Sequence, residues 1–377
     1  MNIVVNTRLL LPGKLEGIGR FTHETLRRMT TNHPEHRFFF LFDRPYSREF
    51  IYSSNVTPVV FGPPARHPLL WYLWFERVVP RALKGLNAHL FLSTDGFASL
   101  STNVPQALVI HDLSFEHRPQ DLRFSHWWFQ HHFVPRYAKK AKRLVTVSGF
   151  SRDDLMQKYH ISESKIDVVP NGVSDMFHPL PVPAIRKVRG KYTNGRPYFL
   201  FVGALQPRKN LVGLLRAFDQ FCQQSTTEID LLIVGGAMHK TSGISRAHRS
   251  MKCGNRVHFT GRVPDVELVQ LMGAALALTF VPFFEGFGIP VIEAMAAGVP
   301  VICSNSSSLP EVGGESVCYV EPDSIDEIAA AMMKIYTDQE YAGDLILSGE
   351  KRSENYTWER SAELLWKSMM KTIEYPS

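Results

Sequence analysis

Residues 282–300 read PFFEGFGIPVIEAMAAGVP and combine three local signals. The end of a strand comes first, then a glycine turn, then the start of a helix. Pro290 suits the first turn of that helix, where its missing N–H is not needed, and Gly298 suits the left-handed residue that follows a helix. The stretch therefore predicts a strand, a turn and a helix in succession, which is the repeating unit of α/β proteins.

Similar units extend outward in both directions. Short β-branched or aromatic runs alternate with longer amphipathic stretches, which predicts parallel sheets covered by helices on both faces. The runs cover residues 3–6, 38–42, 56–61, 89–92, 107–110 and 144–147 in the first half, and 198–202, 230–234, 257–259, 276–280 and 299–303 in the second. Because 377 residues exceed the size at which one core usually stops growing, we expect two α/β domains.

The boundary between the two series follows the turn at Asn171 and Gly172, where prolines at 179, 181 and 183 interrupt any helix. We expect an N-terminal domain over residues 1–178 and a C-terminal domain over 179–355. Residues 356–377 predict a helix, because apolar residues recur at helical spacing between Trp358 and Met370. The apolar side of that helix must pack against another part of the protein.

Two carboxylates flank the glycine turn of the opening stretch. The amides of 287–289 would point out of the helix N-terminus, which attracts anions and can donate to sugar hydroxyls. Gly286 and Gly288 allow close backbone approach. Glu285, and Glu293 eight positions later, would recognise hydroxyls at different depths of one pocket. The alternative is a helix-terminal charge and a solvated helix face.

A second motif, FVGALQPRKN at residues 201–210, also places a glycine turn between a strand and a helix. Arg208 and Lys209 lie near the end of this motif, just before the helix. Arginine binds phosphate oxygens through two parallel hydrogen bonds and lysine adds a compact charge, so the pair suits a diphosphate whose charge grows as a bond breaks. The alternative is a solvated start of a helix.

Two features of the first half point to the same kind of ligand. Gly17 and Gly19 follow the first strand and open a helix, but the loop lacks the full G-x-G-x-x-G pattern and has no acidic ribose contact at the expected distance, which argues against an ordinary dinucleotide enzyme. His111 follows the strand at 107–110 directly and would project at its carboxyl edge. The alternative for His111 is a cap of a turn or helix.

Together these motifs resemble the E-x7-E signature and phosphate loop of the retaining glycosyltransferases called glycosyl transferases group 1, or family 4. The resemblance implies a GT-B fold of two Rossmann-like domains facing each other across a cleft that holds the active site, with the C-terminal helix crossing back to the N-terminal domain. It implies catalytic roles for Glu285, His111, Arg208 and Lys209. It implies donor contacts, by the backbone in the case of Val263, from Gly17, Gly19, Arg208, Lys209, Val263, Glu285, Gly286, Phe287, Gly288, Ile289 and Glu293. One departure is Ala204, where some members carry an arginine that grips phosphate.

The resemblance further implies transfer of a hexose from a nucleotide-diphosphate sugar, with retention and without a metal or other cofactor. The GALQPRKN form of the phosphate loop resembles that of mannosyltransferases in bacterial surface-polysaccharide assembly, including lipopolysaccharide. We therefore expect GDP-mannose as donor and a saccharide or polyprenyl-linked saccharide as acceptor. Two alternatives stay open: a sugar-nucleotide epimerase or hydrolase of the same fold, and a noncatalytic nucleotide-sugar binding protein.

The composition limits the classes of binding partner and the cellular compartment that we expect for the protein. The net charge of +6 favours an anionic partner, but the basic residues are scattered, so nucleic acid is not expected. Four separated cysteines without a CxxC pair, and a first strand in place of a signal peptide, favour the cytoplasm. No apolar stretch is long enough to span a bilayer. The aromatic stretches 69–75 and 127–133 belong either to the core or to a peripheral contact with the inner face of the cell membrane, since Arg66, Arg77, Arg81 and Lys84 flank the first.

Overall fold

The computed structural model describes residues 1–225, 228–236 and 242–374 and divides into two compact units. Unit 1 comprises Met1–Asn171 and Trp358–Ser377, and unit 2 comprises Gly172–Thr357. The sequence places these boundaries at 178/179 and 355/356. Residues 172–178 go with unit 2 because the Val173 amide donates to the Tyr356 carbonyl at 2.9 Å and Val173 forms a bridge with Thr357.

Each unit contains one parallel sheet. The sheet of unit 1 has the order β3-β2-β1-β4-β5-β6-β7 and that of unit 2 the order β10-β9-β8-β11-β12-β13. The strands of unit 1 are β1 Asn2–Asn6, β2 Arg37–Phe42, β3 Val56–Val60, β4 Leu90–Ser93, β5 Gln106–Val109, β6 Arg143–Thr146 and β7 Ile166–Val168. Those of unit 2 are β8 Tyr198–Val202, β9 Asp230–Val234, β10 Val257–Gly261, β11 Ala277–Phe280, β12 Val301–Ser304 and β13 Cys318–Val320.

Helices connect the strands. Those of unit 1 are α1 Gly17–Asn32, α2 Pro68–Leu73, the π-helical η2 Trp74–Val78, α3 Val79–Gly85, α4 Ser114–His117, α5 Phe124–Lys140, α6 Gly149–Tyr159 and α15 Trp358–Glu374. Those of unit 2 are α7 Val182–Thr193, α8 Leu211–Gln224, α9 Ser242–Ser250, α10 Asp265–Gly273, α11 Ile289–Ala296, α12 Leu309–Gly313, α13 Ile325–Thr337 and α14 Gln339–Ser353. Short 3-10 turns are η1 Arg48–Phe50, η3 Pro119–Asp121, η4 Glu163–Lys165, η5 Pro207–Lys209 and η6 Gly254–Arg256.

The predicted α/β architecture is confirmed, and every run named from the sequence forms a strand. Two strands were missed, β7 and β13, which are three residues long and lie at the sheet edges. A run so short carries too few residues to show a period.

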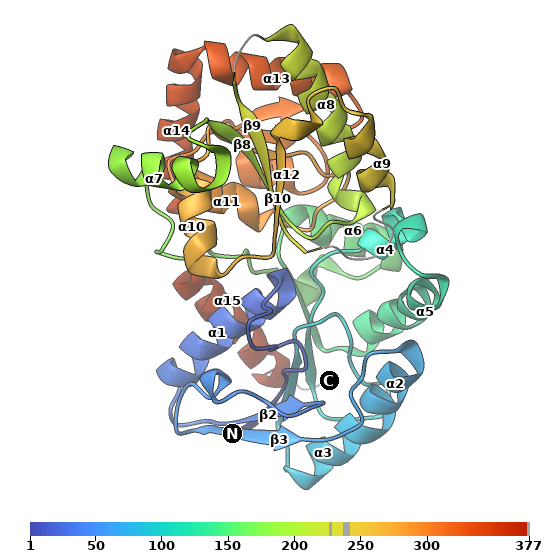
Figure 1. The fold of residues 1–377 in the computed structure, drawn as a ribbon. Helices are drawn as coiled ribbons and strands as arrows, with labels where there is room; N and C mark the ends of the chain where they lie inside the picture. The colour runs from blue at the N-terminus through green and yellow to red at the C-terminus, as the bar shows by residue number, and fades with distance from the viewer. Residues whose placement is uncertain (226–227, 237–241, 375–377) are drawn as a thin grey trace. The chain divides into compact units, whose positions relative to one another are not determined.

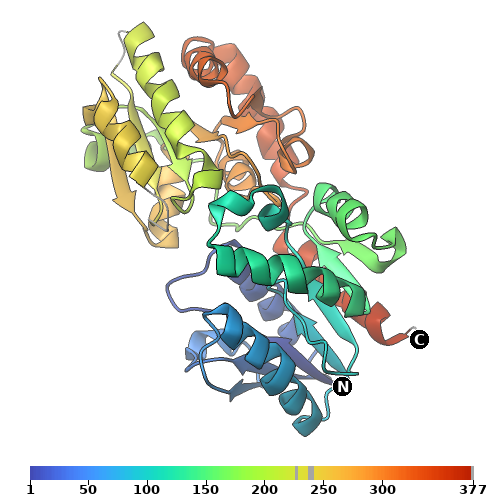
Figure 2. The same cartoon turned by 90° about the vertical axis from the view of Figure 1, so that its right-hand side faces the viewer.

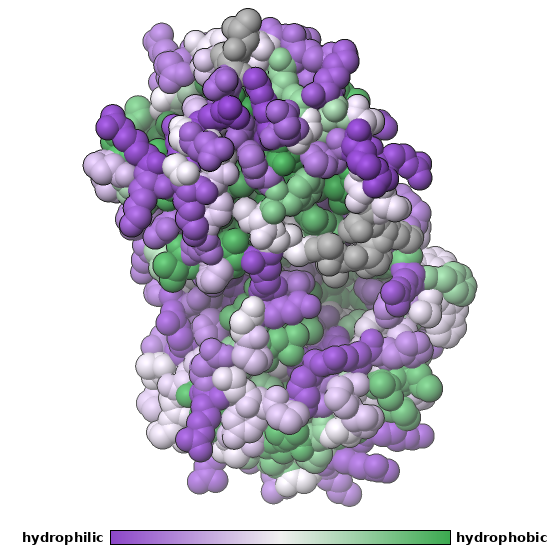
Figure 3. Space-filling model, in the orientation of Figure 1, coloured by the Kyte–Doolittle hydropathy of each residue, from purple (hydrophilic) through white to green (hydrophobic). Residues whose placement is uncertain are grey.

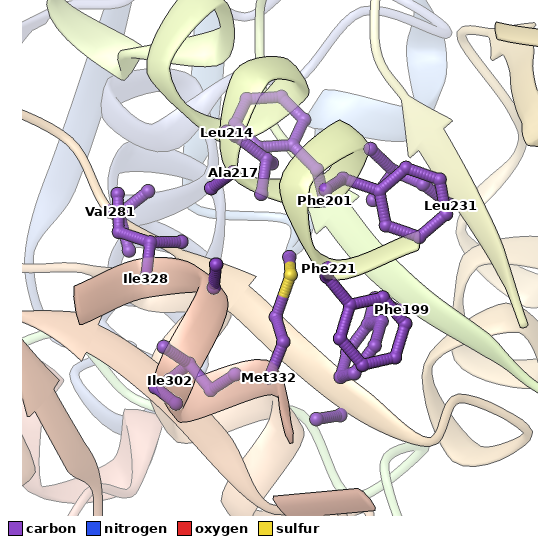
Figure 4. Close-up of a cluster of buried hydrophobic side chains, with 14 of the residues drawn as sticks. Phe199, Phe201, Leu214, Ala217, Phe221, Leu231, Val281, Ile302, Ile328 and Met332 are labelled. Atoms are coloured by element: carbon purple, nitrogen blue, oxygen red, sulfur yellow. The ribbon is translucent and has the colours of Figure 1, made fainter. Parts of the chain in front are cut away.

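The core of unit 2 lies between its sheet and the helices α8, α9 and α13. Figure 4 shows Phe199 and Phe201 of β8 packed against Leu214 and Phe221 of α8, with Met332 of α13 closing the layer. Each of these aromatic side chains buries a large apolar area. The packing holds the carboxyl ends of the strands in fixed positions.

Unit 1 is covered on both faces. Figure 1 shows α1 and α15 on one side of its sheet and α2, α3 and α5 on the other. In α15, Trp358, Leu365 and Met369 are buried, and the Ser361 hydroxyl donates to the Pro170 carbonyl at 2.6 Å. The C-terminal helix thus returns to unit 1, as the resemblance implies. Residues 375–377 of the predicted helix lie outside the described residues.

Candidate active site

The strand order of unit 2 reverses between β8 and β11. From β8 the chain proceeds to β9 and β10 on one side, whereas β11 leads to β12 and β13 on the other. Ligands of open α/β sheets bind outside the carboxyl ends of the strands at such a switch point, because the two loops diverge there. The loops after β8 and β11 carry Arg208, Lys209 and Glu285, so the topology brings these residues together.

Glycines let the loops after β8 and β9 approach each other. Gly203 and Gly235 both have φ of 153°, and a Cβ on Gly235 would lie 1.8 Å from the Gly203 carbonyl oxygen. The Gly203 amide donates to the Val234 carbonyl at 3.0 Å. The methylenes of Lys209 then pass across Gly203, with Cε 3.6 Å from where a Cβ would be. A side chain on Gly235 would push the loops apart.

Asn210 fixes the end of the phosphate loop. It adopts a left-handed conformation with φ of 56° between η5 and α8, and its side chain is buried. Its Nδ2 donates to the carbonyls of Val281 at 3.0 Å and Pro322 at 2.6 Å, which lie beyond β11 and β13. Asn210 thereby ties the loop to the ends of two other strands of the sheet, a role that the sequence motif did not reveal.

The loop after β11 is held by serines from the end of β12. The Glu285 amide donates to Ser307 Oγ at 2.9 Å, and Ser308 Oγ donates to the Glu285 carbonyl at 2.9 Å. Ser304 Oγ donates to the Pro282 carbonyl at 2.7 Å. The backbone of Glu285 is therefore fixed on both sides. These serines belong to the polar run 304–308, which begins at the last residue of β12.

Three charged side chains meet between the two loops. Arg208 Nη1 donates to Glu285 Oε1 at 2.6 Å and to the Phe284 carbonyl at 2.9 Å. Lys209 Nζ forms an ion pair with the same carboxylate oxygen and lies 4.7 Å from the centre of the Phe280 ring. Lys209 and Glu285 are each 7% exposed, which makes their charges strong local features.

The tip of α11 completes this cluster. Gly288 precedes the helix with φ of 105°, and a Cβ there would lie 2.6 Å from Leu309 Cδ2. Gly298 has φ of 66° after the helix, as the sequence predicts, and Pro290 lies in the first turn. Within the described residues, the amides of 287–289 form no hydrogen bond. Unpaired N–H groups at a helix N-terminus are suited to anions and hydroxyl oxygens.

Two other predicted donor residues lie in unit 2. Glu293 is on α11 and is buried rather than on a solvated face. Val263 is half-buried, two residues beyond β10. It follows Gly261, whose carbonyl accepts from the Gly235 amide at 2.9 Å, so it lies at the same carboxyl edge of the sheet as the charged cluster.

His111 lies just beyond β5 at the carboxyl edge of unit 1. Its Nε2 is 3.0 Å from the Thr94 carbonyl and must donate to it, since a carbonyl only accepts. The Phe21 ring contacts its ring edge-on with 5.1 Å between centroids. Burial lowers the pKa of His111 below its usual value of 6.5. A neutral His111 therefore presents Nδ1 as an acceptor.

Gly17 and Gly19 form the first turn of α1, as predicted. Gly17 is exposed. A Cβ on Gly19 would lie 2.9 Å from the Leu9 carbonyl oxygen, so the packing of α1 against the preceding loop explains that glycine without a ligand. Gly17 is the better candidate of the two for contact with a ligand.

The switch point of unit 1 lies between β1 and β4 and is occupied by a residue that the sequence did not single out. Arg8, just after β1, forms a buried ion pair with Asp95, just after β4, and its Nη1 donates to the Ala65 carbonyl at 3.0 Å. Rings of Phe75 and Phe97 surround the guanidinium. The Arg8 side chain therefore lies buried at this switch point with its charge paired.

In the described part of the chain, no group of three or more His, Cys, Asp or Glu side chains is placed to hold a metal ion. All four cysteines are free, and burial together with the nearby Glu285 charge raises the pKa of Cys303. None of the described helices is long and apolar enough to cross a membrane.

Two family models together match most of the chain. Residues 15–176 match the model of glycosyltransferase family 4, and residues 183–352 match the model of glycosyl transferases group 1. The O-antigen chain mannosyltransferase B of Escherichia coli is 30% identical over 220 residues, which cover 58% of this chain and 58% of that relative. The O-antigen chain mannosyltransferase RfbU of Salmonella typhimurium is 29% identical over 271 residues, 71% of each chain.

Solved structures share the whole architecture. WaaG, a glycosyltransferase involved in lipopolysaccharide biosynthesis, matches with a TM-score of 0.76 at 17% identity over 96% of this chain and 97% of WaaG. HepE of Anabaena, solved with UDP-glucose, matches with a TM-score of 0.76 at 17% identity over 98% of this chain and 99% of its own. Together with the two parallel Rossmann-like sheets, these matches define the GT-B fold class. The family models carry the assignment further: the chain belongs to the glycosyl transferases group 1.

Proposed function

We propose that the protein is a retaining, metal-independent hexosyltransferase that uses a nucleotide-diphosphate sugar, with GDP-mannose as the first candidate donor. The observation that carries the proposal is the convergence of Arg208, Lys209 and Glu285 at the switch point of unit 2, beside the tip of α11. Each feature alone has an ordinary structural explanation. Their convergence at the position where α/β sheets bind ligands favours a phosphorylated donor.

Arg208 and Lys209 would hold the diphosphate. Glu285 already fixes both cations, so their charges are in place before the ligand arrives and need little reorganisation. Preorganised charges of this kind act most strongly where negative charge develops during the reaction. Here that charge develops on the departing diphosphate.

The backbone at 287–289 and the buried Glu293 would recognise the sugar. Amides at a helix tip donate hydrogen bonds to hydroxyl oxygens, and a carboxylate accepts hydrogen bonds from hydroxyl groups. The amides and the carboxylate can therefore bind different hydroxyl groups of the same sugar. Gly17, Gly19 and the backbone of Val263 would contribute the remaining donor contacts. His111 would accept a hydrogen bond from a sugar hydroxyl through Nδ1.

The reaction follows from these roles. The bond between the anomeric carbon and the diphosphate oxygen breaks, and its electron pair stays on the diphosphate. The acceptor hydroxyl oxygen bonds to the anomeric carbon from the same face, and its proton passes to an oxygen of the departing diphosphate. The configuration of the sugar is then retained without a glycosyl-enzyme intermediate, and isolation of such an intermediate would overturn this route.

The relatives suggest the donor and the setting. Two of them are named O-antigen chain mannosyltransferases, and HepE was solved with UDP-glucose. We infer for this chain a mannosyl donor and a saccharide or polyprenyl-linked saccharide acceptor in bacterial surface-polysaccharide synthesis, including lipopolysaccharide. Transfer to such an acceptor would take place in the cytoplasm, at the inner face of the membrane.

The test compares donors first and acceptors second. In a thermal-shift screen of nucleotide sugars, GDP-mannose should raise the melting temperature most. The shift is measurable because a ligand at about 100 times its dissociation constant adds about 2.7 kcal/mol of stability. The selected donor is then incubated with the protein alone and with a lipid-linked saccharide fraction. Product that requires the acceptor supports transfer. Free sugar or an epimer formed without acceptor identifies a hydrolase or epimerase, and binding without turnover identifies a binding protein.

A further inference from the structure

Two helical segments of unit 1 lie side by side with their outward sides exposed. The first is the continuous run 68–85 formed by α2, η2 and α3, and the second is α5. Figure 2 turns this side of unit 1 toward the viewer, with the run 68–85 in blue next to α5 in green. We call their outward surface the α2–α5 face. It is formed by Leu69, Tyr72, Leu73, Arg77, Arg81, Lys84, Phe124, Trp128, His132, Arg136 and Lys140, all exposed.

Ring contacts between the two segments show that they run parallel. Trp71 stacks on His126 with 5.1 Å between centroids, and Tyr72 lies 5.7 Å from Phe133. One turn further on, Phe75 lies 6.3 Å from Tyr137. Because numbers rise together in both segments, their N-terminal halves are neighbours and so are their C-terminal halves.

The N-terminal halves expose large apolar side chains. Phe124 is 74% exposed, Leu69 is 64% exposed and Trp128 is 45% exposed. Figure 3 shows hydrophobic atoms at the surface over α2 and over α5. Single exposed apolar residues are normal, but several on adjoining segments form a patch that marks an interaction site.

The C-terminal halves expose cations. On α5 the stripe that begins with Phe124 and Trp128 continues at four-residue spacing through His132 to Arg136 and Lys140. On the other segment Leu69 and Leu73 give way at the same spacing to Arg77 and Arg81. Both segments therefore change from apolar to cationic in the same direction.

The two segments themselves carry almost no acidic residues, although Glu116 of α4 accepts a hydrogen bond from His131 of α5 at 2.8 Å. Residues 122–152 contain no Asp or Glu, and residues 66–88 contain only Glu76. Glu76 is buried, where its carboxylate accepts from the Leu100 amide at 3.0 Å and from Ser101 Oγ at 2.6 Å. The face thus has an unusually one-sided charge compared with the chain as a whole.

We propose that the α2–α5 face binds the surface of an anionic lipid bilayer, with the aromatic end at the level of the headgroups and the cationic end against anionic lipids. Aromatic and leucine side chains beside arginine and lysine are the combination that partitions into a membrane interface. A soluble polyanion would require the cations but not Phe124 or Leu69. A protein partner would not require anionic lipid. The proposal is independent of the reaction proposed above and fails or stands separately from it.

Vesicle flotation tests the proposal directly. The full chain is mixed with phosphatidylcholine vesicles with and without about one third of phosphatidylglycerol, and we expect flotation only with the anionic vesicles. Arg81→Gln with Arg136→Gln should weaken partitioning about 30-fold, which corresponds to about 2 kcal/mol at about 1 kcal/mol per cation. Leu69→Ser with Phe124→Ser should weaken it about 10-fold or more.

Matched controls change exposed residues of unit 2. Leu347→Ser with Val266→Ser removes two comparably exposed apolar side chains, and Arg186→Gln with Lys187→Gln removes two cations of α7; both pairs should bind vesicles as the wild type does. Circular dichroism and melting temperature should show that every variant is folded.

Three results would overturn the proposal. The wild type fails to float with anionic vesicles. The control pairs lose flotation as fully as the variants of the α2–α5 face. The Leu69 and Phe124 variant keeps full binding while the cation variant loses binding equally to vesicles and to heparin, which would identify a polyanion surface.

Discussion

Lys209→Met separates the charge of the phosphate loop from its packing. The methionine keeps an unbranched side chain across Gly203 and over the Phe280 ring but removes the ammonium group that pairs with Glu285. If this ammonium stabilises the departing diphosphate, its loss should cost about 3 to 4 kcal/mol at the transition state, or about 100- to 1,000-fold in turnover.

The same variant should remain folded. Arg208 stays 2.6 Å from the Glu285 carboxylate, so the buried acid keeps a partner. We therefore expect a loss of stability smaller than the roughly 3 to 5 kcal/mol seen when a buried charge is left unpaired. Urea unfolding measures this, and release of nucleoside diphosphate at saturating donor and acceptor measures turnover.

Lys191→Met is the matched control, because it removes the same group from an exposed pair with Glu267 at 2.7 Å. Exposed pairs contribute about 0 to 1 kcal/mol, so stability should change little and turnover not at all. Turnover of Lys209→Met within about 3-fold of wild type, in a folded protein, would refute the assigned role of Lys209.

Three further variants probe the scaffold. Asn210→Ala should lower the free energy of unfolding by about 2 to 3 kcal/mol, since it leaves two buried carbonyls without a donor; an unchanged urea midpoint would contradict this. Gly235→Ala should cost about 3 kcal/mol or more, or prevent folding, because its Cβ would lie 1.8 Å from the Gly203 carbonyl oxygen; a normal melting temperature would show that the two loops can separate freely. Burial favours the neutral form of His111, so the contribution of His111 to stability is full above pH 6.5 and declines as the pH falls below 6.5. The melting temperature of His111→Gln should therefore drop less than that of the wild type between neutral and mildly acidic pH. Equal drops in the two proteins would show that His111 does not contribute to this pH dependence.

The sequence predicted most of the fold because the pattern repeats. Strands such as β8 and β9 are entirely apolar or nearly so, and helices between them are long enough to show a period. β7 and β13 were missed because three residues at an edge carry no such signal. The boundary at 171/172 was placed seven residues too late, because pairing of Val173 with Tyr356 and Thr357 joins segments far apart in the chain.

The convergence of the three charged residues of the candidate site was predictable for a different reason. Arg208, Lys209 and Glu285 lie directly beyond strands, and the order of a parallel sheet fixes which strand ends are neighbours. What supports them was not predictable. Asn210 and Ser307 act through hydrogen bonds to backbone groups that are distant in sequence, and the Arg8–Asp95 pair joins residues 87 positions apart. Such partners follow from the folded chain rather than from local spacing.

The most direct test of the central claim is a crystal structure of the protein with the nucleotide-diphosphate sugar that stabilises it most. The diphosphate oxygens should lie within about 3.2 Å of the side-chain nitrogens of Arg208 and Lys209, and sugar hydroxyls within the same distance of the amides at 287–289. A diphosphate bound away from the carboxyl ends of β8 and β11, with these amides still unpaired, would contradict the account.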